Sequence, residues 1–244
     1  MEQKKSYLPK YQEKWLPSGN LQYPQGILVY YNPFSFGDLL KANQSNFDEA
    51  ELYNFILEGV HVKGMDKQDL TFHDVVYLGW RRKTASLGTS AVEVNAYCPN
   101  CDLRNTNIVE LDKLDFIDVK VKALPINFKV AGEILKFKFI TIRDYIDLLA
   151  KNQTEDILNI YAKCVFNHNF EEAYNILYNA SGDDLERINV LDSLLYHGLK
   201  PIDVECSECK HKYNLTLTDS QEVEILKPFR GQEAIIRDEI SFGE

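Results

Sequence analysis

Hydrophobic and polar positions in the first part of the chain predict a strand followed by a helix. The apolar run over residues 27–31 ends at Pro33, as expected for a strand that leads into a turn. Residues 47–60 carry apolar side chains at helical spacing, and Gly59 lies where a helix commonly ends. Residues 1–15 show neither pattern, and we expect them to form an N-terminal arm.

A second helix is expected over residues 71–86. Thr71 is a suitable N-cap, and Asp74 follows three positions later, in the arrangement of a capping box. This helix ends in a cluster of cations, Arg81, Arg82 and Lys83. Positive charge at a helix C-terminus complements the helix dipole, which is the ordinary explanation for such a cluster. A polyanion site is the alternative.

After residue 86 the pattern changes to a period of two, which predicts antiparallel hairpins. Residues 92–96 and 108–111 flank one turn, and residues 203–205 and 213–217 flank another. A further strand is expected over residues 133–140. Its core candidates are Ile134, Phe137 and Phe139.

A helical block separates the two hairpins. Apolar residues recur at helical spacing over residues 142–149 and 157–164, and again over residues 185–195, with Gly198 just past the end. Cys164 falls on the apolar face of the middle segment, so we interpret it as a small core residue.

Each of the two hairpins carries a Cys-x-x-Cys pair in its turn, Cys98 with Cys101 and Cys206 with Cys209. We call these turns the first knuckle and the second knuckle. Each directs two sulfurs to one side, so together they supply the four thiolates of a structural Zn²⁺ site, with Zn–S distances of about 2.3 Å. Residues 102–205 separate the pairs, but loop-closure entropy grows only logarithmically with length, and metal binding offsets it. The sequence therefore predicts an α+β fold in which antiparallel hairpins form a four-cysteine zinc ribbon, split by a mainly helical insertion.

Three other interpretations of the cysteines are weaker. A redox Cys-x-x-Cys needs a helix N-terminus, whereas both pairs lie between strands. A catalytic zinc keeps an open position, whereas four thiolates fill the coordination shell. His211 could replace one sulfur, although it fits an exposed hairpin position better. Asp102 and Lys210 stand where such turns often have glycine, so the backbone there is expected to need positive φ.

Composition narrows the class of protein. Asp and Glu number 37 against 27 Lys and Arg, which gives a formal net charge of −10. This charge opposes general binding to phosphate backbones, so we expect no nucleic acid partner. No apolar run is long enough to cross a membrane, and residues 1–15 lack the apolar centre of a secretory signal. We therefore expect the protein to stay in the cytosol where it is made.

The familiar catalytic motifs do not occur in the sequence. It has no Gly-rich phosphate loop, no His-Glu-x-x-His and no Gly-x-Ser-x-Gly. The acidic pair at residues 183–184 stands at a helix start, where it complements the helix dipole. With no positive sign of an active site, we expect a protein that is not an enzyme and has no catalytic residues.

Several different short motifs follow one another in a characteristic order along nearly the whole chain. They are Leu16-Pro17-Ser18-Gly19, Tyr23-Pro24, Pro33-Phe34-Ser35-Phe36-Gly37, residues 77–82, Ser86-Leu87-Gly88, the two cysteine pairs and Lys227-Pro228-Phe229. Their order resembles that of the baseplate hub and hub assembly proteins of contractile-tailed, T-even-like bacteriophages, over roughly residues 16–229. The chain departs from this pattern at residues 38–40, where relatives tend to carry an acidic pair.

This resemblance implies a structural or assembly role at the baseplate hub, without catalysis. The implied partners are other hub, tail-tube or spike proteins in a multi-subunit assembly. The implied location is the host cytoplasm during assembly and then the tail baseplate of the virion. A soluble assembly chaperone that is absent from the mature virion, and a zinc-ribbon nucleic-acid-binding protein, are the rival interpretations.

The patterns and the resemblance together suggest an order of segments along the chain. It is an arm over residues 1–15, a β-rich body with the first knuckle over 16–140, a helical insertion over 141–200, the second knuckle over 201–230 and an acidic tail over 231–244. Aromatic side chains anchor many interfaces. The candidates for a contact surface, with core packing as the alternative, are Tyr30, Tyr31, Phe34 and Phe36.

Overall fold

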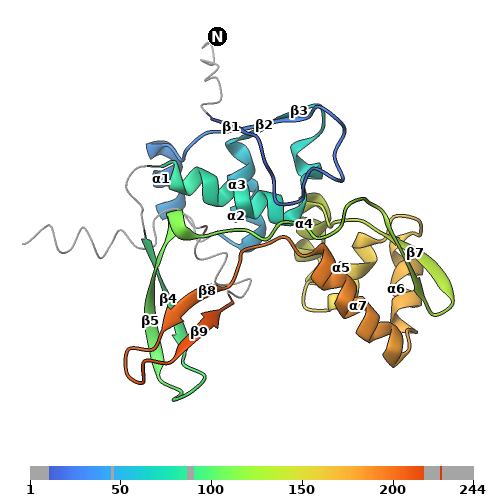
Figure 1. Ribbon diagram of the computed structural model, residues 1–244. Coiled ribbons are helices and arrows are strands. Elements are labelled where there is room, and N and C mark those ends of the chain that lie inside the picture. Colours follow the sequence, from blue (N-terminus) through green and yellow to red (C-terminus); the bar gives the residue numbers. More distant parts are fainter. Residues whose placement is uncertain (1–10, 45–46, 87–90, 217–225, 227–244) are drawn as a thin grey trace, which may run out of the picture.

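A computed structural model describes residues 11–44, 47–86, 91–216 and 226 of the chain (Figure 1). The strands are β1 (Tyr11–Glu13), β2 (Leu28–Tyr31), β3 (Val60–Lys63), β4 (Ala91–Tyr97), β5 (Arg104–Glu110), β6 (Ile126–Val130), β7 (Glu133–Phe137), β8 (Ile202–Glu205) and β9 (Lys212–Leu215). The α-helices are α1 (Phe36–Gln44), α2 (Glu49–Glu58), α3 (Phe72–Thr84), α4 (Ile142–Ala150), α5 (Ile157–Cys164), α6 (Phe170–Tyr178) and α7 (Gly182–Leu195). Short 3-10 helices are η1 (Lys67–Asp69) and η2 (Leu111–Lys113).

The strands of the described chain pair antiparallel. β1, β2 and β3 form one sheet, and β4–β5, β6–β7 and β8–β9 are two-stranded hairpins. The α+β class with antiparallel hairpins is therefore confirmed. The arm expected over residues 1–15 differs in its described part, because Tyr11–Glu13 is the edge strand β1 and pairs with β2.

Two hydrophobic clusters hold the elements together. The first joins the β1–β2–β3 sheet to α2, α3 and α4, and it reaches β4, β5 and β9. Its buried members include Val29, Tyr31, Leu52, Ile56, Val75, Leu78, Val94, Val109, Ile142, Tyr145 and Leu215. The second is formed by the β6–β7 hairpin and α5, α6 and α7. Its buried members are Val130, Leu135, Phe137, Ala162, Cys164, Val165, Ala173, Leu177, Ile188 and Leu191.

The two hydrophobic clusters do not divide the chain at residue 140, the boundary expected between the β-rich body and the helical insertion. The amphipathic stripe of α4 packs on α2, so α4 belongs to the first cluster. The β6–β7 hairpin, which precedes residue 140, belongs to the second. Within β7, Phe137 is buried as expected, as is Phe139 just after it, but Ile134 points outward and is 56% exposed.

Helix starts agree with the sequence where a cap is present. Asp48 and Glu51 form a capping box at α2, and Gly59 follows its last residue. Thr71 caps α3 through its side chain, which accepts a hydrogen bond from the Asp74 amide. Asp74 itself forms no capping box. Its buried carboxylate instead accepts hydrogen bonds from the loop that precedes β2.

Among the cations at the end of α3, Arg82 binds the end of helix α2. Arg82 is only 2% exposed. Its guanidinium donates hydrogen bonds to the carbonyls of Phe55 and Ile56, at the C-terminus of α2, and to the carbonyl of Asn32. Lys83 is buried too. This burial leaves Arg82 and Lys83 inaccessible to a polyanion, and Arg82 supplies donors to carbonyls in the last turn of α2, where helices run short of intrahelical donors.

The four aromatic contact candidates separate into buried and exposed residues. Tyr31 and Phe34 are core residues, so for these two the alternative of core packing holds and the contact surface does not. Both sit under α3, where Arg81 and Arg82 cover their rings. Tyr30 is half-buried, whereas Phe36, the first residue of α1, is 74% exposed. Among the described helices, none has the length and apolar character that a membrane crossing requires.

Candidate metal centre

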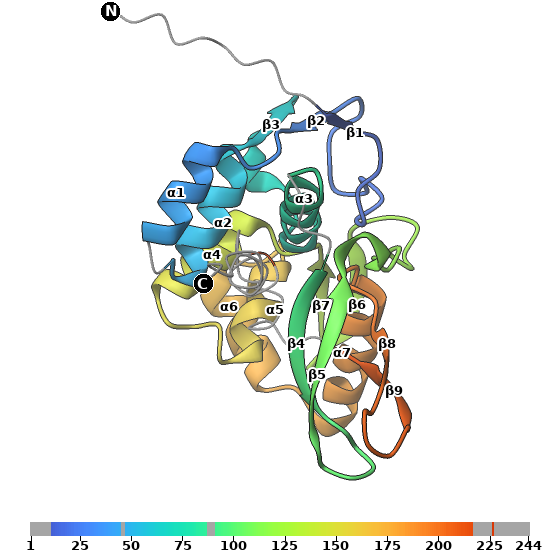
Figure 2. The same ribbon diagram turned by 90° about the vertical axis from the view of Figure 1, so that its left-hand side faces the viewer.

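The two knuckles occupy the turns of neighbouring hairpins. The β4–β5 hairpin closes at the pair Tyr97 and Arg104, and the β8–β9 hairpin closes at the pair Glu205 and Lys212. Figures 1 and 2 show the two hairpins side by side, although the helical block intervenes in the sequence. The expected junction of two distant hairpins is therefore present.

Both turns use a left-handed residue directly after the second cysteine. The φ angle is 56° at Asp102 and 58° at Lys210. In this conformation the two amides donate hydrogen bonds to the carbonyls of Cys98, at 2.9 Å, and Cys206, at 3.2 Å. A non-glycine residue held there costs on the order of 1–2 kcal/mol. The prediction of positive φ at these positions is confirmed, and the shared geometry gives the two knuckles the same shape.

The four sulfur atoms lie together at the meeting point of the knuckles. All of them fall within 4.8 Å of one another. Across the junction, the sulfur of Cys98 is 3.6 Å from that of Cys209, and the sulfur of Cys101 is 3.7 Å from that of Cys206. A regular ZnS₄ tetrahedron with bonds of about 2.3 Å has edges of about 3.8 Å. The donor set and its spacing therefore fit a tetrahedral metal site.

One cysteine of each knuckle is buried and the other faces outward. Cys98 and Cys206 are fully buried, whereas Cys101 and Cys209 are exposed. Each knuckle therefore contributes one sulfur that is shielded from solvent and one that is accessible to it. Cys164, the remaining cysteine, lies in the second hydrophobic cluster, as its helical position predicted.

Backbone amides prepare part of the site for negative charge. The Cys209 amide donates to Cys206 and holds the pKa of that thiol at about 6, and the His211 amide lowers the pKa of Cys209. The Leu103 amide acts in the same sense on Cys101 and is the largest single influence there. The contacts with the other three sulfurs and burial together outweigh it and raise the pKa of Cys101 to about 12. Thiolates this close repel one another, so full deprotonation requires a cation between them.

Two asparagines that the sequence analysis missed contact the sulfurs. Asn105 in β5 donates through Nδ2 to the sulfur of Cys206 at 3.5 Å, and Asn100 in the first knuckle donates through Nδ2 to the sulfur of Cys209 at 3.6 Å. The strand pattern contained a signal for Asn105. Residues of β5 alternate strictly between exposed and buried, which places this polar side chain on the inward face.

The alternative ligand His211 does not join the cluster. Its ring stacks on Tyr213 at 6.2 Å between centroids, and its carbonyl accepts from the amide of Cys206. Its role in the second knuckle is therefore a backbone one. The only group of metal-ligating side chains found within the described residues consists of the four cysteines.

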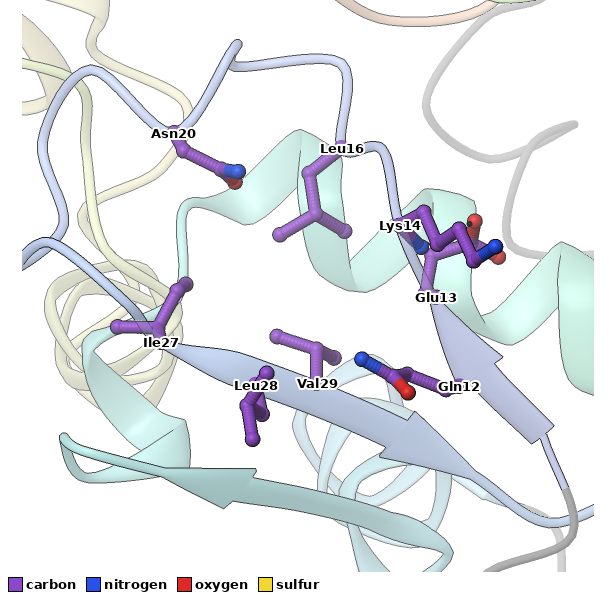
Figure 3. A pocket seen from close by; sticks show the side chains of 8 residues that line it. All are labelled: Gln12, Glu13, Lys14, Leu16, Asn20, Ile27, Leu28 and Val29. Atoms are coloured by element: carbon purple, nitrogen blue, oxygen red, sulfur yellow. Dashed lines mark hydrogen bonds between the residues drawn. The ribbon is translucent and has the colours of Figure 1, made fainter.

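A small hollow of about 220 Å³ lies between β1, β2 and the loop that follows β1 (Figure 3). It is lined by Gln12, Glu13, Lys14, Leu16, Asn20, Ile27, Leu28 and Val29. The carboxylate of Glu13 is engaged by Arg81 at 3.0 Å. The hollow thus combines aliphatic walls with an already paired acid, and its lining brings no nucleophile next to a base.

Comparison with known protein families identifies one family that matches most of the chain. The sequence profile of a family described as T4 bacteriophage base plate protein matches residues 8–223. The chain belongs to this family. The match spans both knuckles and all of the described residues except Leu226. A search of curated proteins found no match, and a search of solved structures found none either.

Membership in the T4 base plate family sets the broad function. The members are baseplate proteins of a phage, typically structural and without enzyme activity, and they assemble with other baseplate proteins. The four-cysteine cluster is consistent with metal binding. Both features agree with the sequence analysis at this level of detail.

Proposed function

We propose that the protein is a structural or assembly subunit of the baseplate hub and that a zinc ion stabilises it. Membership in the base plate family carries this proposal. The hub position rests on the order of the short sequence motifs from Leu16 to Phe229. Its neighbours would then be other hub, tail-tube or spike proteins, met first in the host cytoplasm and retained in the virion.

The zinc part of the proposal assigns Cys98, Cys101, Cys206 and Cys209 as ligands. Four thiolates at tetrahedral spacing favour Zn²⁺ over the hard cations, which take oxygen ligands. When bound, the ion supplies positive charge and fixed geometry and leaves no open position for chemistry. The protein's own part is to hold two hairpins at one point, so that residues 102–205 form a closed loop.

Quantitative mass spectrometry of purified virions tests the role in the particle. A hub subunit is present at a fixed ratio to the tail-tube protein, whereas an assembly chaperone is absent from mature particles and present only in lysates. Elemental analysis of the purified protein tests the ion, and we expect zinc in an equimolar amount. Virions that lack the protein would exclude a permanent subunit and would favour the chaperone.

Positive and negative side chains are balanced around the knuckles, which argues against a nucleic-acid-binding protein. Arg104, Lys210 and Lys212 are balanced there by Asp102 and by carboxylates of the second knuckle and β8. Binding to single- and double-stranded DNA should therefore be undetectable at physiological salt. A salt titration that shows tight binding with a steep slope would restore that alternative.

A further inference from the structure

Asn105 connects the two knuckles directly. Its side chain is almost completely buried, at 3% exposure, in the strand that follows the first knuckle. The Oδ1 atom accepts hydrogen bonds from the backbone amide of Ser207 at 3.0 Å and from its hydroxyl at 2.8 Å. The Nδ2 group donates to the carbonyl of Leu103 at 2.9 Å and to the sulfur of Cys206 at 3.5 Å. One amide thus joins residues on both sides of the junction.

The side-chain amides that donate hydrogen bonds to sulfur lie on the first hairpin. Among the described hydrogen bonds between side-chain amides and sulfur, both cross from the first hairpin to the second, from Asn100 to Cys209 and from Asn105 to Cys206. Asn100 is exposed, whereas the Asn105 bond is shielded from water. Hydrogen bonds to charged sulfur in such a setting are stronger than neutral ones. The first hairpin therefore offers donors to the sulfurs that the second hairpin brings.

We propose that Asn105 is the positioning residue that docks the second knuckle on the first and orients Cys206 toward the metal. This inference rests on the proposed metal function. Because its bonds to Ser207 need no ion, Asn105 holds the hairpins together before metal arrives. The entropic cost of bringing the hairpins together is then already met when the ion binds, so metal affinity depends on this residue. Second-layer contacts of this kind commonly change metal affinity about 10–100-fold.

Cobalt titration of the full chain tests the proposal, because four-thiolate Co²⁺ sites have strong charge-transfer and d–d bands. Asn105→Ala removes all four contacts, and we expect Co²⁺ and Zn²⁺ affinity, measured in competition with a chelator, to fall about 10–100-fold. Asn107→Ala is the matched control, because this buried asparagine lies two positions along the same face of β5 and its Nδ2 group has no hydrogen-bond partner among the described residues. Its affinity should stay close to that of the unmodified protein.

Asn105→Asp separates the two kinds of contact. The carboxylate still accepts from Ser207 but no longer donates to the carbonyl of Leu103 or to the sulfur of Cys206, and its charge repels the thiolate. If orientation of the sulfur matters, this variant binds metal more weakly than Asn105→Ala and its charge-transfer band shifts. Amide exchange at Ser207 in the metal-free protein should be fast in Asn105→Ala and slow in Asn105→Asp.

The outcomes distinguish the inference from the function on which it rests. Equal affinities for the Asn105→Ala and Asn107→Ala variants would overturn the positioning role while leaving the metal site intact. An unmodified protein that binds neither Co²⁺ nor Zn²⁺ would overturn the metal site itself. Circular dichroism of each variant shows whether the helices are retained, and Asn105→Asp remains informative if Asn105→Ala does not fold.

Discussion

The hydroxyl of Ser18 donates a hydrogen bond of 2.6 Å to the carboxylate of Asp74, 56 positions further along the chain. The Ser18 amide donates to the same carboxylate at 3.0 Å, and so does the hydroxyl of Tyr23. Ser18 and Asp74 are both fully buried. A buried carboxylate is stable only when several donors surround it. The loop over residues 16–23 is therefore anchored to the start of α3 by charge-assisted hydrogen bonds.

Asp74→Ala should destabilise the protein by about 3 kcal/mol, because the substitution leaves buried donors on Ser18 and Tyr23 without an acceptor. Urea denaturation monitored by circular dichroism measures the loss. Asp118→Ala, at an exposed site, is the control and should change stability by less than about 0.5 kcal/mol. Similar losses in both variants would show that the buried network contributes nothing special.

Cys206→Ser should release the bound zinc and lower the free energy of unfolding by about 3 kcal/mol or more, because a serine oxygen replaces a thiolate ligand. Cys164→Ala is the matched control, since Cys164 is buried in the second cluster, away from the knuckles. We expect that variant to keep its zinc and to lose only packing energy. Zinc retained by Cys206→Ser at an unchanged melting temperature contradicts the four-sulfur assignment.

Gly59 and Arg82 should show strongly non-additive effects. A Cβ atom at residue 59 would lie 2.2 Å from the guanidinium carbon of Arg82, while φ at residue 59, −94°, suits any residue. Gly59→Ala should therefore cost about 2 kcal/mol or more through overlap alone. In an Arg82→Ala background that cost should largely vanish, although Arg82→Ala is itself destabilising because it removes the buried hydrogen bonds of the guanidinium to backbone carbonyls.

A double-mutant cycle by urea denaturation measures this coupling. Gly182→Ala serves as the control, because no atom lies within 4 Å of the Cβ position there. We expect that substitution to be neutral or stabilising. If the costs of Gly59→Ala and Arg82→Ala simply add, the overlap is relieved by movement of the backbone and the close approach is not a constraint.

Two histidines near the end of α7 should make the fold sensitive to acid. Burial lowers the pKa of His197, and burial together with the charge of His197 lowers the pKa of His73 well below its ordinary value. The contact of His197 with the carbonyl of Leu195 and the nearby Asp74 favour the charged ring, but burial outweighs both. Since the unfolded state then binds more protons, the stability contribution is present above about pH 6.5 and is lost as pH falls below it.

Imidazole NMR titration checks the direction of these shifts, with signals assigned from His73→Gln and His197→Gln. Both rings should stay neutral to lower pH than a free histidine does. The slope of unfolding free energy against pH should be positive between about pH 5 and 6.5. Either ring titrating at or above about pH 6.5 would contradict the effect of burial.

The sequence predicted the elements whose signals are local. The capping residue Thr71, the glycine after α2 and the alternation in β4 and β5 each act within a few positions, and the structure has all three features. The cysteine pairs were predictable over a long distance, because a tetrahedral ion needs four donors and each pair has only two. That requirement links residues 98–101 with residues 206–209 whatever lies between them.

What the sequence did not predict depends on packing between distant segments. Asp74 reads as a capping residue because the donors on Ser18 and Tyr23 are invisible from its own helix. Arg82 reads as a solvent-facing cation, because nothing local shows that α2 ends against it. For Asn105 the alternation in β5 indicates an inward side chain, but its partner Ser207 belongs to the other hairpin and cannot be identified from the strand.

Phe36 is the exposed aromatic side chain through which we expect contact with other baseplate proteins. It opens α1 and is 74% exposed, and Leu40, one turn later, is 46% exposed. The start of the helix is held by hydrogen bonds between Ser35 and Asp38, so the ring is presented on a fixed element. Ordered, exposed aromatic side chains are common anchors of interfaces, where truncation costs about 2 kcal/mol or more of binding.

Phe36→Ser should therefore leave the unfolding free energy within about 0.5 kcal/mol of the unmodified value, because the side chain contributes little to the core. Incorporation of the variant into baseplates, measured by complementation and quantitative mass spectrometry of particles, should fall. Tyr178→Ser, at a 68% exposed aromatic on α6, is the matched control from the other hydrophobic cluster and should assemble normally. Equal incorporation of both variants would remove Phe36 from the contact surface, whereas equal loss would mean that exposed aromatics act through solubility, not through one defined contact.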